Sequence, residues 1–173
     1  MLRLANAYID KAVLSLRTGG KIGITNSVII NPNNLKLEGW YVESLFEKGS
    51  FILPIAEVRD FISKGIVVDD HDALTLPEDM IRLKEVIELR FELIGKAVIT
   101  ESKKKLGKVD DYAVDDLTSL IQKMYVNPPM LKGFTSDQLL ISRQDIVEIN
   151  DKKIIVRDAL VHSRVGVPVT AQA

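Results

Sequence analysis

The stretch Lys104–Asp116, KKLGKVDDYAVDD, places a lysine cluster and four aspartates inside a segment that otherwise has the composition of a β-strand. Val109 and Tyr112 are apolar and the two aspartates between them are not, so the inward face changes parity at this point. A β-bulge produces such a change, and Gly107 just before it permits the sharp bend that closes a small barrel. The stretch therefore predicts the bent corner of a small β-barrel.

The chain also repeats itself, which indicates two copies of one β-rich module. Five blocks of the first half match blocks of the second in the same order, with only small gaps between them. The matches are Ile9–Val13 with Ile94–Val98, Lys21–Gly23 with Lys105–Gly107, Trp40–Val42 with Met124–Val126, Phe51–Leu53 with Leu139–Ile141, and Lys64–Asp70 with Lys152–Asp158.

Within the first copy, β-branched and aromatic runs alternate with turn residues, which predicts short strands. The glycine pair Gly19–Gly20 supplies a hairpin turn. The apolar spacing of Ile55–Phe61 predicts one or two helical turns. The expected strands are 13–16, 22–30, 37–46, 51–53 and 66–68.

Between the copies, the hydrophobic period changes to that of a helix. Thr75 and Glu78 fit a capping box, and Pro77 suits the first turn, where its missing N–H costs nothing. One apolar face follows, made of Met80, Leu83, Ile87 and Phe91. We therefore expect a mainly β protein with two tandem small barrels at residues 1–76 and 90–165, a linker helix at 77–89 and a loose tail at 166–173.

The second copy resembles the PRC-barrel, the small barrel found at the C-terminal end of the photosynthetic reaction-centre H subunit and in ribosome maturation factors. The resemblance rests on Gly95–Val98, Leu106–Asp111 and Gln138–Ile141; the first copy departs from it with Asp10 in place of the opening glycine. It implies a barrel used for docking, without catalytic residues to transfer. We see neither the anchor of the H subunit nor the extra N-terminal domain of the ribosome factor, so neither role is inherited.

Two clusters of acidic residues raise the alternative of a metal site. Asp110, Asp111, Asp115 and Asp116 are split by an apolar strand, unlike the alternating oxygen ligands of a calcium loop, and Asn26, Ser27 and Asn31 stand at the matching places of the first copy. We interpret these carboxylates as partners of backbone N–H groups in a bend. The run Asp69–Asp72 contains His71 and could hold zinc, but consecutive residues of an extended chain point to opposite faces, which favours a solvated loop.

Composition narrows the classes of function. The net charge is −1 and there are no cysteines, which suits a reducing cytosol, so we expect a cytoplasmic protein. No phosphate-binding loop or nucleophile motif occurs, and we expect no enzyme activity, no cofactor, no metal and no small-molecule substrate.

The remaining expectation is that the protein docks onto another protein. Trp40, Met130, Leu131 and Phe134 are the candidate contact residues, the last three on a stretch that follows two prolines. The alternative is that these three cover a barrel end and that Trp40 is core. Ribosomal, cell-division and membrane-complex partners and self-association all stay open. RNA or ribosome binding through the basic patch of Lys103, Lys104, Lys105 and Lys108 is the alternative function.

Overall fold

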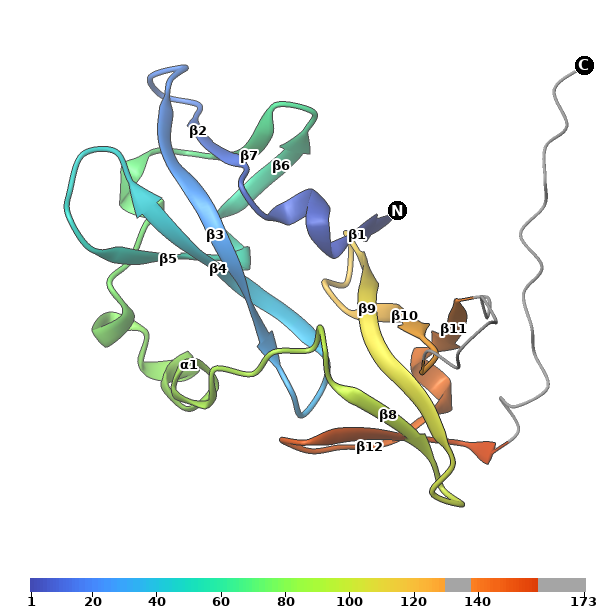
Figure 1. Cartoon of the computed structure of the whole chain (residues 1–173). Helices are drawn as coiled ribbons and strands as arrows, with labels where there is room; N and C mark the ends of the chain where they lie inside the picture. The colour runs from blue at the N-terminus through green and yellow to red at the C-terminus, as the bar shows by residue number, and fades with distance from the viewer. Residues whose placement is uncertain (130–137, 159–173) are drawn as a thin grey trace, which may run out of the picture. The chain divides into compact units, whose positions relative to one another are not determined.

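The computed structural model describes residues 1–129 and 138–158, which form mainly β-strands (Figure 1). Their contacts divide the chain into two compact units. The first unit comprises residues 1–92 together with 114–121, and the second comprises 93–113 together with the described residues from 122 onward. Each unit has its own curled sheet, so the expectation of a mainly β fold is confirmed. The tail expected at 166–173 lies outside the described residues.

The sheet of the first unit has the strand order β5-β4-β3-β2-β7-β6. Neighbouring strands are antiparallel except β2 and β7, which are parallel. The strands are β2 (Ala12–Ser15), β3 (Lys21–Asn31), β4 (Lys36–Ser44), β5 (Ser50–Pro54), β6 (Val58–Ile62) and β7 (Gly65–Val68), preceded by β1 (Leu2–Leu4) and the 3₁₀ turn η1 (Ala5–Tyr8).

The main path of the second sheet has the order β11-β10-β9-β8-β13-β12, which is the order of the first sheet carried forward by six strands. Its parallel pair is again the one that joins the first and last strands of the repeat, β8 and β13. The strands are β8 (Ala97–Thr100), β9 (Lys105–Asp115), β10 (Ile121–Asn127), β11 (Leu139–Ser142), β12 (Ile146–Ile149) and β13 (Lys153–Val156), with the 3₁₀ turn η6 (Arg143–Asp145) before β12.

The two sheets begin in the same way at the level of single hydrogen bonds. The N–H of Asp10 donates to the carbonyl oxygen of Thr25 at 2.8 Å, and the N–H of Gly95 donates to that of Val109 at 2.7 Å. Asp10 and Gly95 both have positive φ angles, 55° and 81°. Aspartate is among the residues that tolerate this left-handed conformation. Asp10 therefore preserves the backbone geometry of the glycine that it stands for.

Each sheet buries an apolar core on its inner face. In the first unit, Val13, Trp40, Ile52 and Val68 are completely buried, and in the second, Val98, Val126, Ile141, Ile154 and Val156 are. Burial along β9 shows the expected change of parity, because Val109 and Tyr112 are both buried while Asp110 between them is exposed. The corresponding part of β3 shifts register against β4 between Thr25 and Ser27. The predicted bend is therefore present in both halves.

The five strands expected in the first copy begin and end within two residues of the observed ones. The helical segment expected in the same copy differs. Residues 55–61, expected to be helical, form a single 3₁₀ turn, η2 (Ile55–Glu57), followed by β6. The helical expectation is wrong because β6 pairs with β7, and a cross-strand ladder outweighs the helix-like spacing of a short apolar segment.

The linker also differs from the expected single helix. It consists of η4 (Pro77–Asp79), η5 (Ile81–Leu83) and α1 (Lys84–Leu89), preceded by η3 (His71–Ala73). Thr75 does not cap it, because the N-cap position is occupied by Leu76, where no side-chain cap is present. The backbone of Thr75 is paired instead with that of Ile52, through two hydrogen bonds of 2.8 Å. Met80, with ψ of 60°, then interrupts the helix. Pro77 occupies the first turn as predicted, and α1 packs on β3.

Residues 114–121, which include the end of the opening stretch, belong to the first unit. The carboxylate of Asp116 accepts hydrogen bonds from Arg3 Nε at 2.8 Å and from the hydroxyl of Tyr8 at 3.1 Å. Within residues 1–129 and 138–158, no helix has the length and apolar character needed to span a bilayer.

Candidate functional site

The four aspartates of the opening stretch have four separate partners. Asp111 and Asp115 accept hydrogen bonds from the backbone N–H groups of Tyr112 and Leu117, both at 2.8 Å. Asp110 accepts from Gln138 Nε2 at 3.0 Å, and Asp116 binds Arg3 and Tyr8 as described above. The carboxylates therefore serve the local backbone and neighbouring side chains, as the bend interpretation expects of Asp111 and Asp115, and they do not converge on one point.

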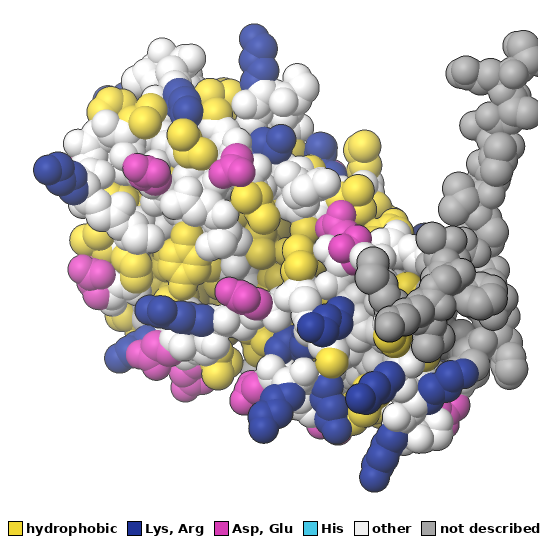
Figure 2. Space-filling model, in the orientation of Figure 1, with side chains coloured by type: hydrophobic (Ala, Val, Ile, Leu, Met, Phe, Trp, Pro, Cys, Tyr) yellow, Lys and Arg dark blue, Asp and Glu magenta, His cyan; other side chains and the backbone are white. Residues whose placement is uncertain are grey.

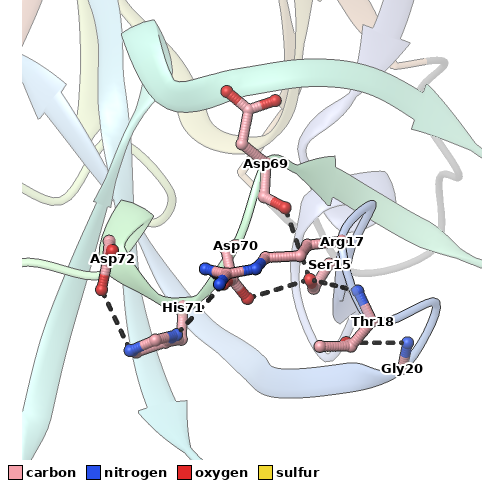
Figure 3. Close-up of polar contacts among 8 residues, drawn as sticks. All are labelled: Ser15, Arg17, Thr18, Gly20, Asp69, Asp70, His71 and Asp72. Atoms are coloured by element: carbon pink, nitrogen blue, oxygen red, sulfur yellow. Dashed lines mark hydrogen bonds and ion pairs between the residues drawn. The ribbon is translucent and has the colours of Figure 1, made fainter.

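The Asp69–Asp72 run is held by several different interactions (Figure 3). Asp69 Oδ2 binds Arg59 at 2.6 Å, and its carboxylate points away from that of Asp70. Asp70 accepts from Ser15 Oγ at 3.0 Å and from Arg17 at 2.9 Å. Among the described residues, no group of three or more His, Asp or Glu side chains has an arrangement that could hold a metal ion.

Asp70 fastens the β2–β3 hairpin to the end of β7. The backbone N–H of His71 contributes most to lowering the pKa of Asp70 to about 2, and Ser15 and Arg17 add to the effect. The second unit has the same device, since Asp158 accepts from Ser102 Oγ at 2.7 Å and this hydrogen bond is the main cause of its lowered pKa. These carboxylates are structural anchors in both halves.

The expected basic patch lies at and beside the turn between β8 and β9. Lys103, with φ of 66°, is in the turn, and Lys104, Lys105 and Lys108 follow it. All four side chains are exposed. Within residues 1–129 and 138–158, none of the four has an acidic side chain within ion-pair distance. Their charges therefore face solvent without a protein counter-charge.

A groove of about 680 Å³ runs beside this patch. We call it the β8–β9 groove. Most of its lining is apolar, and Lys105, Lys108 and Asp110 supply the charged groups. Its lining residues are Ile94, Gly95, Ala97, Val98, Ile99, Lys105, Gly107, Lys108, Val109, Asp110, Asn127, Pro128 and Pro129.

Strand register explains how apolar and basic side chains come to share this surface. Ala97 lies opposite Lys108 and Ile99 lies opposite Lys105. Opposed residues of antiparallel strands project to the same face, so the four side chains form one strip. Val98 and Val109 project into the core and are buried. The strip is therefore the outer face of the β8–β9 pair.

Gly107 brings a third strand against this strip. Its φ is 142°, and a Cβ there would overlap the carbonyl oxygen of Asn127 and lie 2.9 Å from Cα of Pro128. Only glycine lets the backbone at the end of β10 pass this close. The close approach places Asn127, Pro128 and Pro129 along one side of the groove.

The matching surface of the first unit carries different charges. Lys21 lies opposite Leu14 there, as Lys105 lies opposite Ile99, but the position of Lys108 is taken by Ile24. The repeat alignment places Glu43 at the position of Asn127. Each replacement makes the second unit more positive by one charge. The groove surface is thus specialised relative to its counterpart.

Trp40, one of the candidate contact residues, lies in the core, which was the alternative interpretation. Its side chain is completely buried, and its ring centroid lies 5.7 Å from that of Tyr8 and 5.9 Å from that of Phe61. Its Nε1 has no hydrogen-bond partner among the described residues. Met130, Leu131 and Phe134 lie outside the described residues, and in the sequence they follow directly after the groove residue Pro129.

Sequence reasoning did not single out the apolar part of the groove. Ile94 is 48% exposed, which the sequence of a barrel strand does not reveal. A signal was available in β8, where Ala97 and Ile99 alternate with the buried Val98 and Thr100 and so form a second apolar face on a short strand.

Two other hollows are less suited to an apolar ligand surface. One of about 280 Å³ in the first unit lies between β3 and α1 and includes Arg90 and Glu92. Another of about 500 Å³ in the second unit is lined mainly by polar residues, including Lys123, Arg143 and Gln144. The β8–β9 groove is the larger and more apolar surface.

Residues 85–160 match the family model of the PRC-barrel domain. The match covers the second sheet and supports one such domain in this half of the chain. A PRC-barrel domain suggests a protein-interaction or adaptor role, and the fold family is non-catalytic. No curated protein sequence matches the chain significantly.

Proposed function

We propose that this protein is a cytoplasmic, non-enzymatic docking adaptor that binds another protein through the β8–β9 groove. One observation carries the proposal: the exposed Ile94, the half-buried Ala97 and Ile99 and two lysines without protein counter-charges line one groove on a sheet whose sequence matches the PRC-barrel domain. Exposed apolar surface rimmed by charged groups is typical of protein interaction sites.

In this proposal, the first half of the chain is a second barrel of the same type. Its sheet has the equivalent strand order and the equivalent parallel pair. A residue with a positive φ angle, Asp10, precedes its first strand of the repeat, as Gly95 does in the second unit. Its aspartate anchor also recurs, with Asp70 on Ser15 as Asp158 is on Ser102. These parallels support a tandem arrangement that arose by duplication.

The filled interior of each sheet directs binding to the outside. Trp40 and Tyr8 fill the core of the first unit, and Met124 and Ile154 fill that of the second, all with exposed fractions of 1% or less. A small barrel whose interior is occupied by side chains holds no sizeable ligand there. The outer faces and loops are then the surfaces open to a partner.

The substitution Ile94→Asp tests this proposal by placing a charge in the apolar lining of the groove. The full-length variant and the wild type are used to capture partners from cells of the source organism, and recovery is quantified by mass spectrometry. Ile62→Asp is the matched control, because Ile62 is 42% exposed in the first unit against 48% for Ile94. We expect Ile94→Asp to lose the specific partners and Ile62→Asp to retain them.

Circular dichroism of both variants checks whether the fold survives. Retention of every partner by a folded Ile94→Asp variant would place docking elsewhere on the chain. Loss of captured RNA with unchanged protein partners would support the alternative role in RNA binding through Lys103, Lys104, Lys105 and Lys108.

The stretch after the groove gives a second, independent variant. Leu131→Asp/Phe134→Ser changes two of the candidate contact residues that follow Pro129 in the sequence. A folded double variant that loses the same partners as Ile94→Asp would extend the docking surface to Met130, Leu131 and Phe134. A folded double variant that keeps them would limit the surface to the groove.

A further inference from the structure

We infer that the segment recognised by the β8–β9 groove is an extended peptide in which apolar side chains are flanked by aspartate or glutamate. This inference rests on the proposed docking function and adds the chemistry of the partner. Apolar side chains of the segment pack against Ala97 and Ile99, and its carboxylates pair with Lys105 and Lys108.

The spacing of the strip suits an extended chain. Along a strand, side chains on one face recur every second residue, about 7 Å apart. Ala97 and Ile99 have this relation, and their cross-strand neighbours Lys108 and Lys105 lie beside them. A partner in extended conformation presents its own side chains at the same interval, so alternate residues meet the strip. The groove volume of about 680 Å³ is within the range of sites that take several side chains.

Ile94, Pro128 and Pro129 form the remaining apolar borders of the groove. Pro128 and Pro129 lack backbone N–H groups, so they offer a partner no backbone donor there. Recognition on this side therefore depends on apolar contact. Polar recognition comes from Lys105 and Lys108, which both lie on β9.

The local charge favours an acidic partner. Residues 101–110, the turn and its flanks, carry four positive charges on Lys103, Lys104, Lys105 and Lys108, against two negative charges on Glu101 and Asp110. Asp158, which binds Ser102 in the turn, adds a third negative charge. Asp110 is also engaged, since Gln138 Nε2 donates to its carboxylate at 3.0 Å. The whole chain has a net charge of −1, so this positive area is a local feature. Complementary charge steers association and sets register.

Figure 2 shows Lys and Arg side chains gathered over the region of the second sheet on the face that it presents. The first unit lacks the same combination, because Ile24 and Glu43 stand at the positions of Lys108 and Asn127. The difference of two charges separates an acidic-peptide surface from its counterpart within one chain. This internal comparison supplies a control of the same fold.

A nucleic acid is a less favoured partner of the groove than an acidic peptide. Sequence-tolerant binding of single strands uses aromatic side chains as stacking platforms, and none of the described residues that line the groove is aromatic. The lining is instead aliphatic, which suits the side chains of a peptide.

Selection of a phage-displayed library of random twelve-residue peptides on the full-length protein tests the inference. The selected peptides are then synthesised and their affinities measured at two salt concentrations. We expect enrichment of peptides with alternating apolar and acidic residues, and weaker binding at high salt. Lys105→Glu/Lys108→Glu should reduce the affinity for these peptides about tenfold or more, the effect of reversing two exposed charge contacts.

Lys21→Glu/Lys48→Glu is the matched control, because it makes the same change of charge on exposed residues of the first unit. It should leave peptide affinity within about twofold. Absence of acidic enrichment, failure to select any peptide, or equal weakening by both double variants would overturn the inference. In each of these cases, the loss of native partners in Ile94→Asp would still support docking at the groove, so the two proposals fail separately. A Lys105→Glu/Lys108→Glu variant that loses only RNA binding, with its affinity for the peptides unchanged, would also overturn the inference.

Discussion

Gly107 and the carbonyl oxygen of Asn127 are so close that any side chain at position 107 would overlap this oxygen. The first unit has a similar contact at the matching glycine, because a Cβ on Gly23 would lie 2.6 Å from Cγ1 of Val42 and 2.9 Å from the carbonyl oxygen of Glu43. The two halves therefore bend their second strand against the next one in the same way. In the second unit this contact also shapes the groove.

Gly107→Ala is predicted to destabilise the second unit by about 3 kcal/mol, because positive-φ strain adds to the overlap with backbone atoms. Gly95→Ala is the control. Gly95 also has a positive φ, 81°, but nothing lies within 4 Å of its Cβ position, so its cost should be about 1 kcal/mol. Denaturant unfolding followed by far-UV circular dichroism compares the two. Equal costs would contradict the role of the Gly107–Asn127 contact.

Trp40→Ala is predicted to destabilise the first unit by about 3–5 kcal/mol, since it empties a completely buried site packed by Tyr8 and Phe61. Trp40→Phe should cost clearly less, because it retains an aromatic ring and removes a buried Nε1–H that has no partner among the described residues. Thermal unfolding of the two variants measures the difference. A mild effect of Trp40→Ala would mean that Trp40 is not core.

Asp70 is predicted to stabilise the protein in a defined pH range. Its pKa is about 2 in the folded protein, below the value of about 3.9 for an unfolded chain. The stabilisation is therefore complete above about pH 4 and is lost as the pH falls from there toward 2. Asp70→Asn should lower stability at neutral pH and flatten the decline between pH 4 and pH 2.

Asp72→Asn serves as the control for this acid-dependent effect, since the side chain of Asp72 is 82% exposed and contacts His71. Its stability at neutral pH should remain close to that of the wild type. Urea unfolding across this pH range measures both variants. An acid dependence of Asp70→Asn identical to that of the wild type would show that another group anchors the hairpin.

The strands could be predicted because alternation and turn residues are local signals. Ile22–Ile30 ends at a Pro-Asn turn, and the observed β3 ends at Asn31. The segment 55–61 and the linker 77–89 could not. A short apolar run fits a helix as well as a strand, and neither the pairing of β6 with the adjacent β7 nor that of Thr75 with Ile52 is encoded in its spacing. Local spacing carries no information on such partners.

Some residues of the candidate site could likewise be predicted from the sequence, and others could not. Lys105 and Lys108 were evident as part of a lysine cluster, which needs only composition. Ile94, Pro128 and Pro129 join them only through the register of β8 with β9 and the close approach at Gly107. Trp40 had two interpretations because an aromatic residue in a strand suits a core and an interface equally.

Site-specific photo-crosslinking tests the central claim most directly. A benzophenone amino acid replaces Pro129, an exposed groove residue, or Leu45, which is 52% exposed at the matching position of the first unit. Both full-length proteins are irradiated in cells of the source organism. The account predicts a discrete protein adduct from position 129 that disappears with Ile94→Asp, and none of that mass from position 45. The same adduct from both positions, or an adduct at 129 that survives Ile94→Asp, would contradict docking at the β8–β9 groove.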